Sequence, residues 1–213
     1  MALHILNRPF VQHTLTILRS KKTDQITFRK GMVRLGRILG YEIADIFDSS
    51  DILVDTPVAK AKGLVINDID NIVIINVMRA ATPLVEGLLK AFPNARQGVV
   101  VAKRDEADNL KSPDAMTVNV YYSKIPELNK KDTLIIADPM LATAATMLKV
   151  LDLVNGQPKR VCIAAAIASK YGIKRVSDKR PDIEIFTAAV DDTLNEKGYI
   201  VPGLGDAGDR AFG

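Results

Sequence analysis

Asp138 stands at the end of an apolar run, residues 133–137, and Thr143 follows it five positions later. The run is rich in β-branched residues and is typical of a strand buried on both faces, which Pro139 ends because it lacks an N–H for the ladder. From Thr143 onward, apolar residues recur at helical spacing. An acid after a buried strand, followed by a threonine turn into a helix, is typical of a phosphate site, because a helix N-terminus offers free N–H groups to an anion. An ordinary strand–helix turn is the alternative interpretation.

Two arginines follow two other predicted strands. Arg79 comes after the strand at residues 72–77, and Arg104 comes after the strand at residues 98–102. Because ligands of an open α/β sheet bind outside the carboxyl ends of its strands, we expect both guanidinium groups near Asp138. Guanidinium groups are always charged and bind phosphate at two points. This edge of the sheet is therefore predicted to hold a substrate rich in phosphate groups.

The elements around these residues alternate along the chain. Buried strands are predicted at residues 72–77, 98–102, 133–137, 160–166 and 183–190, with helices from residues 82, 143 and 169. This alternation predicts an α/β fold, a mostly parallel twisted sheet flanked by helices, with right-handed crossovers. Helical spacing earlier in the chain predicts an N-terminal helical arm, residues 1–50, followed by two short strands around a turn at residues 52–57 and 62–65.

Length and composition favour a single domain over all 213 residues, and a hydrophobic content of 47% is enough for a sizeable core. The single cysteine, Cys162, excludes a disulfide within the chain and favours a reducing, cytoplasmic compartment. No apolar run approaches the roughly 20 residues of a membrane helix, so no membrane partner is expected. A net charge of +4 is mild for this length, and no nucleic-acid partner is expected.

Three further segments differ from the rest of the chain. Residues 104–123 begin polar and end in strand-like alternation, which predicts a mobile hairpin that closes on a ligand, with a passive surface hairpin as the alternative. The helix through residues 29–37 is basic; a solvated face is the simpler interpretation, and binding of phosphate or a partner subunit is the other. Residues 198–210 hold four glycines and a proline, which predicts little regular structure and close approach of the backbone to a flat ligand.

The sequences DPMLAT at residues 138–143 and GYIVPGLGDAGD at residues 198–209, together with VMRA at residues 77–80, resemble the uracil phosphoribosyltransferase family. The C-terminal motif is the specific part, because the strand–turn motif alone would indicate only a type I phosphoribosyltransferase fold. The resemblance implies a glycosyltransferase of pyrimidine salvage. Such an enzyme moves the 5-phosphoribosyl group of phosphoribosyl diphosphate (PRPP) to N1 of uracil and forms UMP and diphosphate. Mg²⁺ assists, carried by PRPP and not ligated directly by the protein.

The resemblance also assigns residues. Those implied to bind PRPP are Arg79, Arg104, Asp138, Pro139, Met140, Leu141, Ala142, Thr143, Ala144, Ala145, Thr146 and Asp206. Those implied to bind uracil, within the base-binding segment 191–213, are Ile200, Gly205, Asp206 and Ala207. Asp138, Arg104 and Asp206 are the implied catalytic residues. Several members are activated by GTP and form homodimers or homotetramers, which points to an effector site at Lys30, Gly31, Met32, Val33 and Arg34.

This chain departs from the family pattern at the turn. Most members have Thr-Gly-Gly where it has Thr143-Ala144-Ala145. Glycine adopts positive φ freely and alanine does not. If the turn is a plain helix N-terminus, alanine suits it, and if a left-handed residue is needed, PRPP binding is weakened. The single acid at Asp138, where many phosphoribosyltransferases have two, makes metal dependence a separate question.

Other functions remain as alternatives. A pI near 9.1 and the basic helix would suit a phosphoribosyltransferase-like regulator of pyrimidine genes that binds nucleic acid. A purine or orotate transferase would keep the same fold. The C-terminal motif argues against all three, because a pure binder needs no base site and the other transferases lack this motif.

Overall fold

The computed structural model describes residues 2–104 and 116–213, without the side chain of Arg104, so most of the predicted hairpin at residues 104–123 lies outside the described residues. The strands are β1 (Ala2–Ile5), β2 (Ser49–Asp55), β3 (Lys60–Ile66), β4 (Ile72–Met78), β5 (Arg96–Arg104), β6 (Val118–Lys124), β7 (Thr133–Ala137), β8 (Met140–Leu141), β9 (Arg160–Ser169), β10 (Glu184–Asp191), β11 (Thr193–Leu194) and β12 (Ile200–Val201). The helices are α1 (Pro9–Arg19), α2 (Gln25–Ala44), α3 (Thr82–Ala91), α4 (Ala145–Asp152), α5 (Lys170–Lys179) and α6 (Ala207–Phe212).

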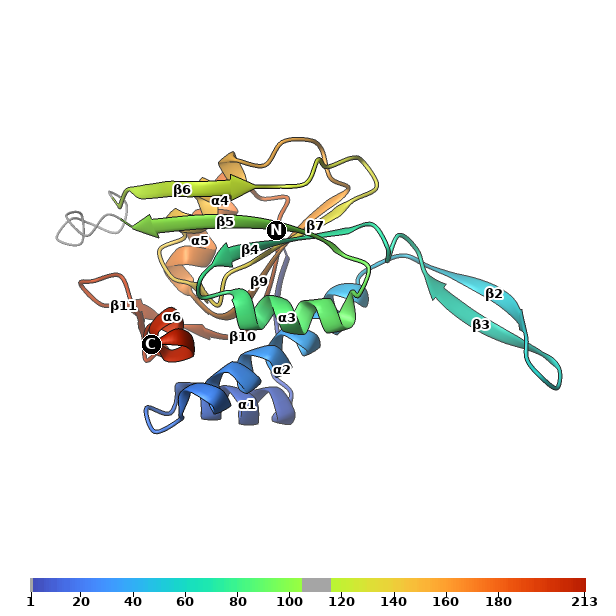
Figure 1. Ribbon diagram of the computed structural model, residues 1–213, viewed down its shortest axis with the longest axis horizontal. Helices are drawn as coiled ribbons and strands as arrows, with labels where there is room; N and C mark the ends of the chain where they lie inside the picture. The colour runs from blue at the N-terminus through green and yellow to red at the C-terminus, as the bar shows by residue number, and fades with distance from the viewer. Residues whose placement is uncertain (1, 105–115) are drawn as a thin grey trace.

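An eight-stranded sheet forms the centre of the molecule (Figure 1). Its order is β1-β10-β9-β7-β4-β5-β6, with β8 beside β9. β5 and β6 pair antiparallel, and the other neighbours in this order pair parallel. β7 is buried along its whole length, as its apolar run predicts. The predicted α/β fold with a mostly parallel sheet is confirmed.

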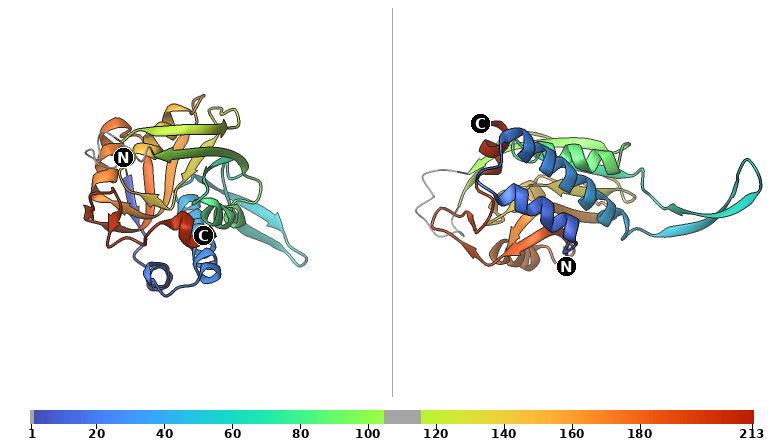
Figure 2. Two further views of the ribbon diagram at one scale, coloured as in Figure 1. Left: turned by 60° about the vertical axis from the view of Figure 1, so that its left-hand side comes forward. Right: turned by 90° about the horizontal axis from the view of Figure 1, so that it is seen from below.

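Helices cover both faces of the sheet. α1, α2 and α3 lie on one face, and α4 and α5 lie on the other (Figures 1 and 2). α2 and α3 approach closely at two glycines: a Cβ on Gly36 would lie 2.0 Å from the Leu84 carbonyl oxygen, and one on Gly87 would lie 2.1 Å from that of Val33. Within the described residues, no helix is both long and apolar enough to cross a membrane.

The strand order reverses between β4 and β7. From β4 the chain moves through α3 to β5, whereas from β7 it moves through α4 to β9, on the other side. Right-handed crossovers in opposite directions place their helices on opposite faces, so the strand ends between them open into a crevice. The chain segments that leave β4 and β7 begin with Arg79 and Asp138. The fold therefore brings these two residues to one crevice.

Both ends of the chain differ from the sequence-based prediction. Residues 2–5 form β1, which pairs with β10; a segment this short has no usable periodicity, so no strand is predicted there. The C-terminal segment is predicted to have little regular structure, but residues 207–212 form α6. Asp206 caps this helix by accepting a hydrogen bond of 2.9 Å from the Asp209 N–H, a signal that the nearby glycines obscure.

β2 and β3 form an antiparallel hairpin that extends away from the body of the molecule (Figures 1 and 2). Its strands occupy the predicted region but are longer than predicted. One face of the hairpin carries Ile52, Val54 and Val65 and the other carries Leu53 and Leu64, all exposed to solvent. We call this hairpin the β-arm.

Cys162 lies near the start of β9 with no solvent exposure. Burial raises the pKa of its thiol to about 12, so the group stays protonated and acts as a small apolar side chain.

Candidate active site

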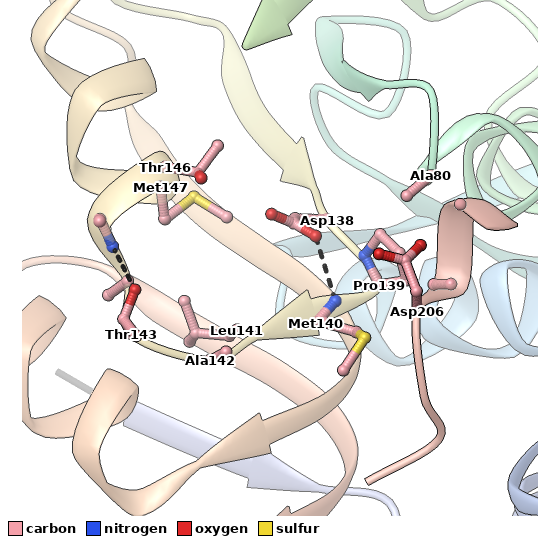
Figure 3. A pocket seen from close by; sticks show the side chains of 14 residues that line it. Ala80, Asp138, Pro139, Met140, Leu141, Ala142, Thr143, Thr146, Met147 and Asp206 are labelled. Atoms are coloured by element: carbon pink, nitrogen blue, oxygen red, sulfur yellow. Dashed lines mark hydrogen bonds between the residues drawn. The ribbon is translucent and has the colours of Figure 1, made fainter. Parts of the chain in front are cut away.

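Two adjoining pockets lie at the carboxyl ends of β4 and β7. The smaller, which we call the loop pocket, has a volume of about 110 Å³ and is lined by residues 138–147 together with Ala80, Asp206, Ala207 and Gly208 (Figure 3). The larger, which we call the wide cleft, has a volume of about 750 Å³. Its walls include Arg79 and Lys103, and it shares Asp138, Thr146 and Asp206 with the loop pocket. A volume of this order suits a small-molecule ligand, since such sites span roughly 300–1,000 Å³.

The loop pocket is built by the turn that joins β7 to α4. Asp138 accepts a hydrogen bond of 3.1 Å from the Met140 N–H, which sets the direction of the chain after β7. The first hydrogen bond inside the helix runs from the Leu148 N–H to the Ala144 carbonyl oxygen, at 2.9 Å. The N–H groups of Thr146 and Met147 therefore have no acceptor within α4. These donors and the positive end of the helix dipole suit an anion such as phosphate.

Ala144 is the residue that decides between the two sequence-based interpretations of the turn. It has φ 60° and ψ 2°, in the left-handed region, and α4 begins after it at Ala145, not at Thr143. The side chain is buried, with 4% exposure. For a residue with a Cβ, this conformation costs roughly 1–2 kcal/mol. The turn is therefore of the kind that favours glycine, and this chain forms it with alanine.

Two carboxylates meet where the pockets join. Asp138 and Asp206 line both of them and approach from opposite sides, Asp138 from the end of β7 and Asp206 from the start of α6 (Figure 3). Thr146, from α4, lies across from Asp138. Segments far apart in the sequence thus place two negative charges and a hydroxyl around one space.

Arg79 lies in the wall of the wide cleft, where the sequence predicts it. Its guanidinium donates to the Asp209 carboxylate at 3.2 Å and to the Gly213 carbonyl oxygen at 3.4 Å, and it lies 5.9 Å from the centre of the Phe212 ring. Arg104 ends β5, which places its backbone at the same edge of the sheet, but its side chain lies outside the described residues.

Only some of the residues predicted to bind the base line a pocket. Ala207 and Asp206 line the loop pocket, whereas Ile200 and Gly205 line neither pocket. Ile200 is 3% exposed and pairs with Leu194 between β12 and β11. Two residues that are absent from the sequence-based prediction, Lys197 and Tyr199, line the wide cleft instead.

An ion pair that the sequence does not reveal holds the C-terminal segment in place. Arg19, at the end of α1, donates two hydrogen bonds to the Asp191 carboxylate, at 2.8 and 2.7 Å, and another of 2.8 Å to the Gly203 carbonyl oxygen. Asp191 also accepts the Gly203 N–H at 3.0 Å and is 7% exposed. The N-terminal helices therefore fix the chain that leads to Asp206.

Arg210 makes a second set of contacts of this kind. Its guanidinium donates to the carbonyl oxygens of Leu204, at 2.8 Å, and Ser20, at 2.6 Å, and also bonds to that of Leu18. It lies 4.3 Å from the centre of the Phe28 ring. Burial lowers the pKa of Arg210 from its ordinary value. The sequence offers no signal for Arg19 or Arg210, because an arginine on a helix looks the same whether it is solvated or paired.

The five residues of the predicted effector site do not converge on one place. Lys30 and Val33 line a third pocket of about 530 Å³ between α2, α3 and Phe212 of α6. Gly31 and Met32 face the core. Arg34 lies over the ring of Phe10, 5.5 Å from its centre.

Comparison with known proteins identifies the family. A profile described as uracil phosphoribosyltransferase matches residues 5–213. The chain is 58% identical to the uracil phosphoribosyltransferase of Metallosphaera sedula and 57% identical to that of Sulfurisphaera tokodaii, covering all of both proteins in each case. Among solved structures, the AQ2163 protein of Aquifex aeolicus has a TM-score of 0.85 at 34% identity, with 99% of this chain and 97% of that one covered.

These matches confirm the resemblance drawn from the two motifs, and they give no support to a nucleic-acid-binding regulator. The match extends through the N-terminal helices as well as the site, so it does not rest on the motifs alone. The chain belongs to the uracil phosphoribosyltransferase family.

Proposed function

We propose that the protein transfers the 5-phosphoribosyl group of PRPP to N1 of uracil, forming UMP and diphosphate. The observation that carries this proposal is the loop pocket, an anion site at a helix N-terminus that opens into a cleft between two carboxylates, in a chain matched to the family over nearly its full length. The protein's single thiol, reduced and buried, suits a cytoplasmic setting.

The reaction requires the substrates to be positioned and the developing charges to be stabilised, and it needs no nucleophilic side chain. The bond from the anomeric carbon to diphosphate breaks as the bond to N1 forms, the N1 proton is lost, and positive charge develops on the ribose while negative charge develops on diphosphate. We assign the 5-phosphate to the loop pocket at Thr143–Thr146, the ribose hydroxyls to Asp138, and the diphosphate to Arg79 and Arg104. Positioning and preorganised charges can supply most of the rate of such a step.

One assay tests this function. The purified protein is incubated with PRPP, Mg²⁺ and each nucleobase in turn, and diphosphate release is followed. Release that depends on uracil, with UMP as the second product, is the expected result. Release with a purine or with orotate but not with uracil would overturn the assignment, and so would no release with any base.

Asp138→Asn is expected to lower kcat/KM by about 10- to 150-fold. The loss of one charged hydrogen bond costs roughly 1.5–3 kcal/mol, which gives this range of rates. Asparagine can still accept the Met140 N–H, so the melting temperature should be unchanged. Steady-state kinetics measures the role of Asp138 in the reaction, and thermal unfolding of the same preparation measures its role in the turn. Activity within threefold of the unsubstituted protein would leave Asp138 with only its role in the turn.

We place Mg²⁺ on the diphosphate of PRPP. Among residues 2–104 and 116–213, no three His, Cys, Asp or Glu side chains form a cluster that could hold a metal ion alone. The oxygen donors present at the site do suit Mg²⁺, which commonly binds one or two carboxylates together with substrate phosphates. Asp138 and Asp206 are the residues that would face it. The ion would supply positive charge to the leaving diphosphate.

We place a GTP effector at the third pocket, with Lys30 on its rim. The walls combine apolar side chains (Ile26, Val33 and Phe212) with three cations (Arg29, Lys30 and Lys90) and one carboxylate, Glu86, which pairs with Lys90 at 3.3 Å. The excess of positive charge suits a base that carries phosphates. A Lys30→Ala, Lys90→Ala double variant, which removes two of the cations in the pocket wall, is expected to lose any activation by GTP while keeping its basal rate. The matched control is Lys21→Ala, Lys22→Ala in the exposed turn after α1. GTP that changes neither rate nor oligomer size in the unsubstituted protein would exclude this site.

We also propose that the protein is a homodimer or homotetramer that assembles through the β-arm. Exposed apolar side chains lie on both faces of this projecting hairpin, Ile52, Val54 and Val65 on one and Leu53 and Leu64 on the other, and such surfaces mark contact sites. Ile52→Glu, Val54→Glu is expected to lower the mass found by sedimentation, whereas Lys179→Glu, at the exposed end of α5 and outside the arm, is not. Unchanged assembly in the first variant would contradict the role of this face.

A further inference from the structure

The N-terminal half of α5 lies against the outer side of the turn that forms the loop pocket. The Ser169 hydroxyl, which caps α5 by accepting the Gly172 N–H at 2.8 Å, donates to the Ala142 carbonyl oxygen at 2.6 Å. Arg175, farther along α5, donates from its guanidinium to the Thr143 carbonyl oxygen at 2.7 Å. Consecutive carbonyls of the turn are therefore held by α5.

Gly172 allows this close approach. A Cβ at that position would lie 2.4 Å from the Ala142 carbonyl oxygen and 2.7 Å from that of Leu141. Both distances are too short for real atoms, so a side chain would push the turn away from α5. Ser169, Gly172 and Arg175 are one helical turn apart and thus face the loop together.

By holding the carbonyl groups of these peptides, the contacts with α5 also fix the direction of the N–H groups of the same peptides. The peptides that link residues 142 to 144 are trans, so the N–H of each points away from its carbonyl. Because the carbonyls of Ala142 and Thr143 face α5, the N–H groups of Thr143 and Ala144 point to the other side. No residue of α5 lines the loop pocket, whereas residues 142–144 do. The contacts with α5 therefore aim main-chain donors at the pocket.

The Thr143 carbonyl directly precedes the left-handed Ala144. The orientation of the peptide between them depends on φ of Ala144, and a glycine would reach φ 60° without steric cost. Alanine needs its surroundings to hold that conformation. The guanidinium of Arg175 supplies a charged hydrogen bond to the peptide concerned, a stronger bond than a neutral donor gives.

We propose that Arg175 is a positioning residue for phosphoribosyl binding. It holds the Thr143 carbonyl so that the turn keeps its left-handed Ala144 and points its N–H groups at the 5-phosphate. Arg175 itself does not line the pocket. The proposal rests on the assignment of the loop pocket to the 5-phosphate of PRPP and UMP.

A merely structural role for Arg175 makes a different prediction. Its guanidinium also lies 5.7 Å from the centre of the Tyr171 ring, so its loss could simply weaken α5. Weakening α5 would affect stability and all ligands alike. Loss of positioning would affect only ligands that carry the 5-phosphate, and a glycine at position 144 would restore them.

The experiment combines Arg175→Met, Ala144→Gly and the double variant, with Lys174→Met as the matched control on the exposed side of α5. The measurements are KM for PRPP, KM for uracil, kcat, and the dissociation constants of UMP and uridine. For Arg175→Met we expect KM for PRPP and the UMP dissociation constant to rise about 10-fold, as for loss of one charged hydrogen bond. The values for uracil and uridine should stay within about threefold, and so should every value for Lys174→Met.

The double variant provides the decisive comparison. If Arg175 acts through the conformation of Ala144, adding Ala144→Gly should bring KM for PRPP back to within about threefold of the Ala144→Gly value, a coupling typical of residues in one network. An unchanged KM for PRPP in Arg175→Met, an equal rise for uracil, or no recovery in the double variant would each overturn the proposal. Should Arg175→Met fail to fold, Arg175→Gln takes its place with the same expected pattern.

The unsubstituted protein separates this proposal from the function on which it rests. If it neither forms nor binds UMP, the proposed function fails. If it is active and Arg175→Met matches it in KM for PRPP, only the role of Arg175 fails.

Discussion

Uracil is expected to be converted about 10⁴-fold faster than cytosine at equal PRPP concentration, a ratio typical of sites that pair every polar group of a substrate. Uracil presents a donor at N3 and acceptors at O2 and O4, whereas cytosine presents an acceptor at N3 and a donor at C4. We expect the main chain of the C-terminal segment to bind the base, and of the residues named from the sequence Asp206 and Ala207 line the loop pocket, whereas Ile200 and Gly205 line neither pocket. Main-chain groups cannot exchange donor for acceptor. The ratio of kcat/KM for the two bases measures the discrimination directly.

Contacts with the N-terminal helices hold the main chain of the C-terminal segment in one conformation, so its donors and acceptors cannot adjust to a different base. Arg19 and Arg210 bond to the main chain at Gly203 and Leu204, so the segment cannot rotate its peptides to suit the other base without breaking these bonds. Thymine is a useful control, because it has the hydrogen-bonding pattern of uracil and differs only in a methyl group. Comparable rates on uracil and cytosine would contradict a site formed by fixed main-chain groups.

Arg19→Met is expected to lower the free energy of unfolding by about 3–5 kcal/mol, the usual result of removing one partner from a buried ion pair. The substitution leaves the Asp191 carboxylate, 7% exposed, without its two charged hydrogen bonds. For a chain of this size each kcal/mol lowers the melting temperature by about 2–4 °C, so a fall of about 6–20 °C is expected. Denaturant unfolding gives the free energy, and KM for uracil should rise because Gly203 loses its support.

Arg8→Met is the matched control. Arg8 forms an ion pair of 2.7 Å with Glu42, but its side chain is 66% exposed. Exposed pairs contribute about 0–1 kcal/mol, so the control should unfold nearly as the unsubstituted protein does. A loss below about 1 kcal/mol in Arg19→Met would show that its pair behaves like a surface pair.

The central fold is predictable because its signal is local. β4 and β7 are short, mostly apolar runs buried on both faces, and each is followed by a helix with its own apolar periodicity. β1 is not predictable from its four residues, because what makes it a strand is the exposed edge of β10, about 180 residues away. Helix α6 is not predicted from the sequence, because the glycines around it weaken the helical pattern.

The residues of the site also fall into those that the sequence predicts and those that it does not. Arg79 and Asp138 can be placed from sequence because each directly follows a buried strand. The conformation of Ala144 cannot, because it depends on a hydrogen bond that Arg175 of α5 donates to the Thr143 carbonyl oxygen, which no local pattern reveals. Arg19 and Arg175 escape prediction for a related reason: their partners lie on segments that only the fold brings near.

Hydrogen bonds between the N-terminal helices and the C-terminal segment affect the order in which the parts of the protein fold. Arg19 and Asp191 are 172 positions apart, and Arg210 and Ser20 are 190 apart. A nascent chain leaves the ribosome N-terminus first, at about 5–20 residues per second, so α1 and α2 wait many seconds for the residues that complete their contacts. Closing a loop of this length costs about 2 kcal/mol more than closing one of 20 residues, which the packed sheet can offset by holding both ends close. The central strands are thus expected to form before residues 191–213 dock, so a complete site is expected only late in folding.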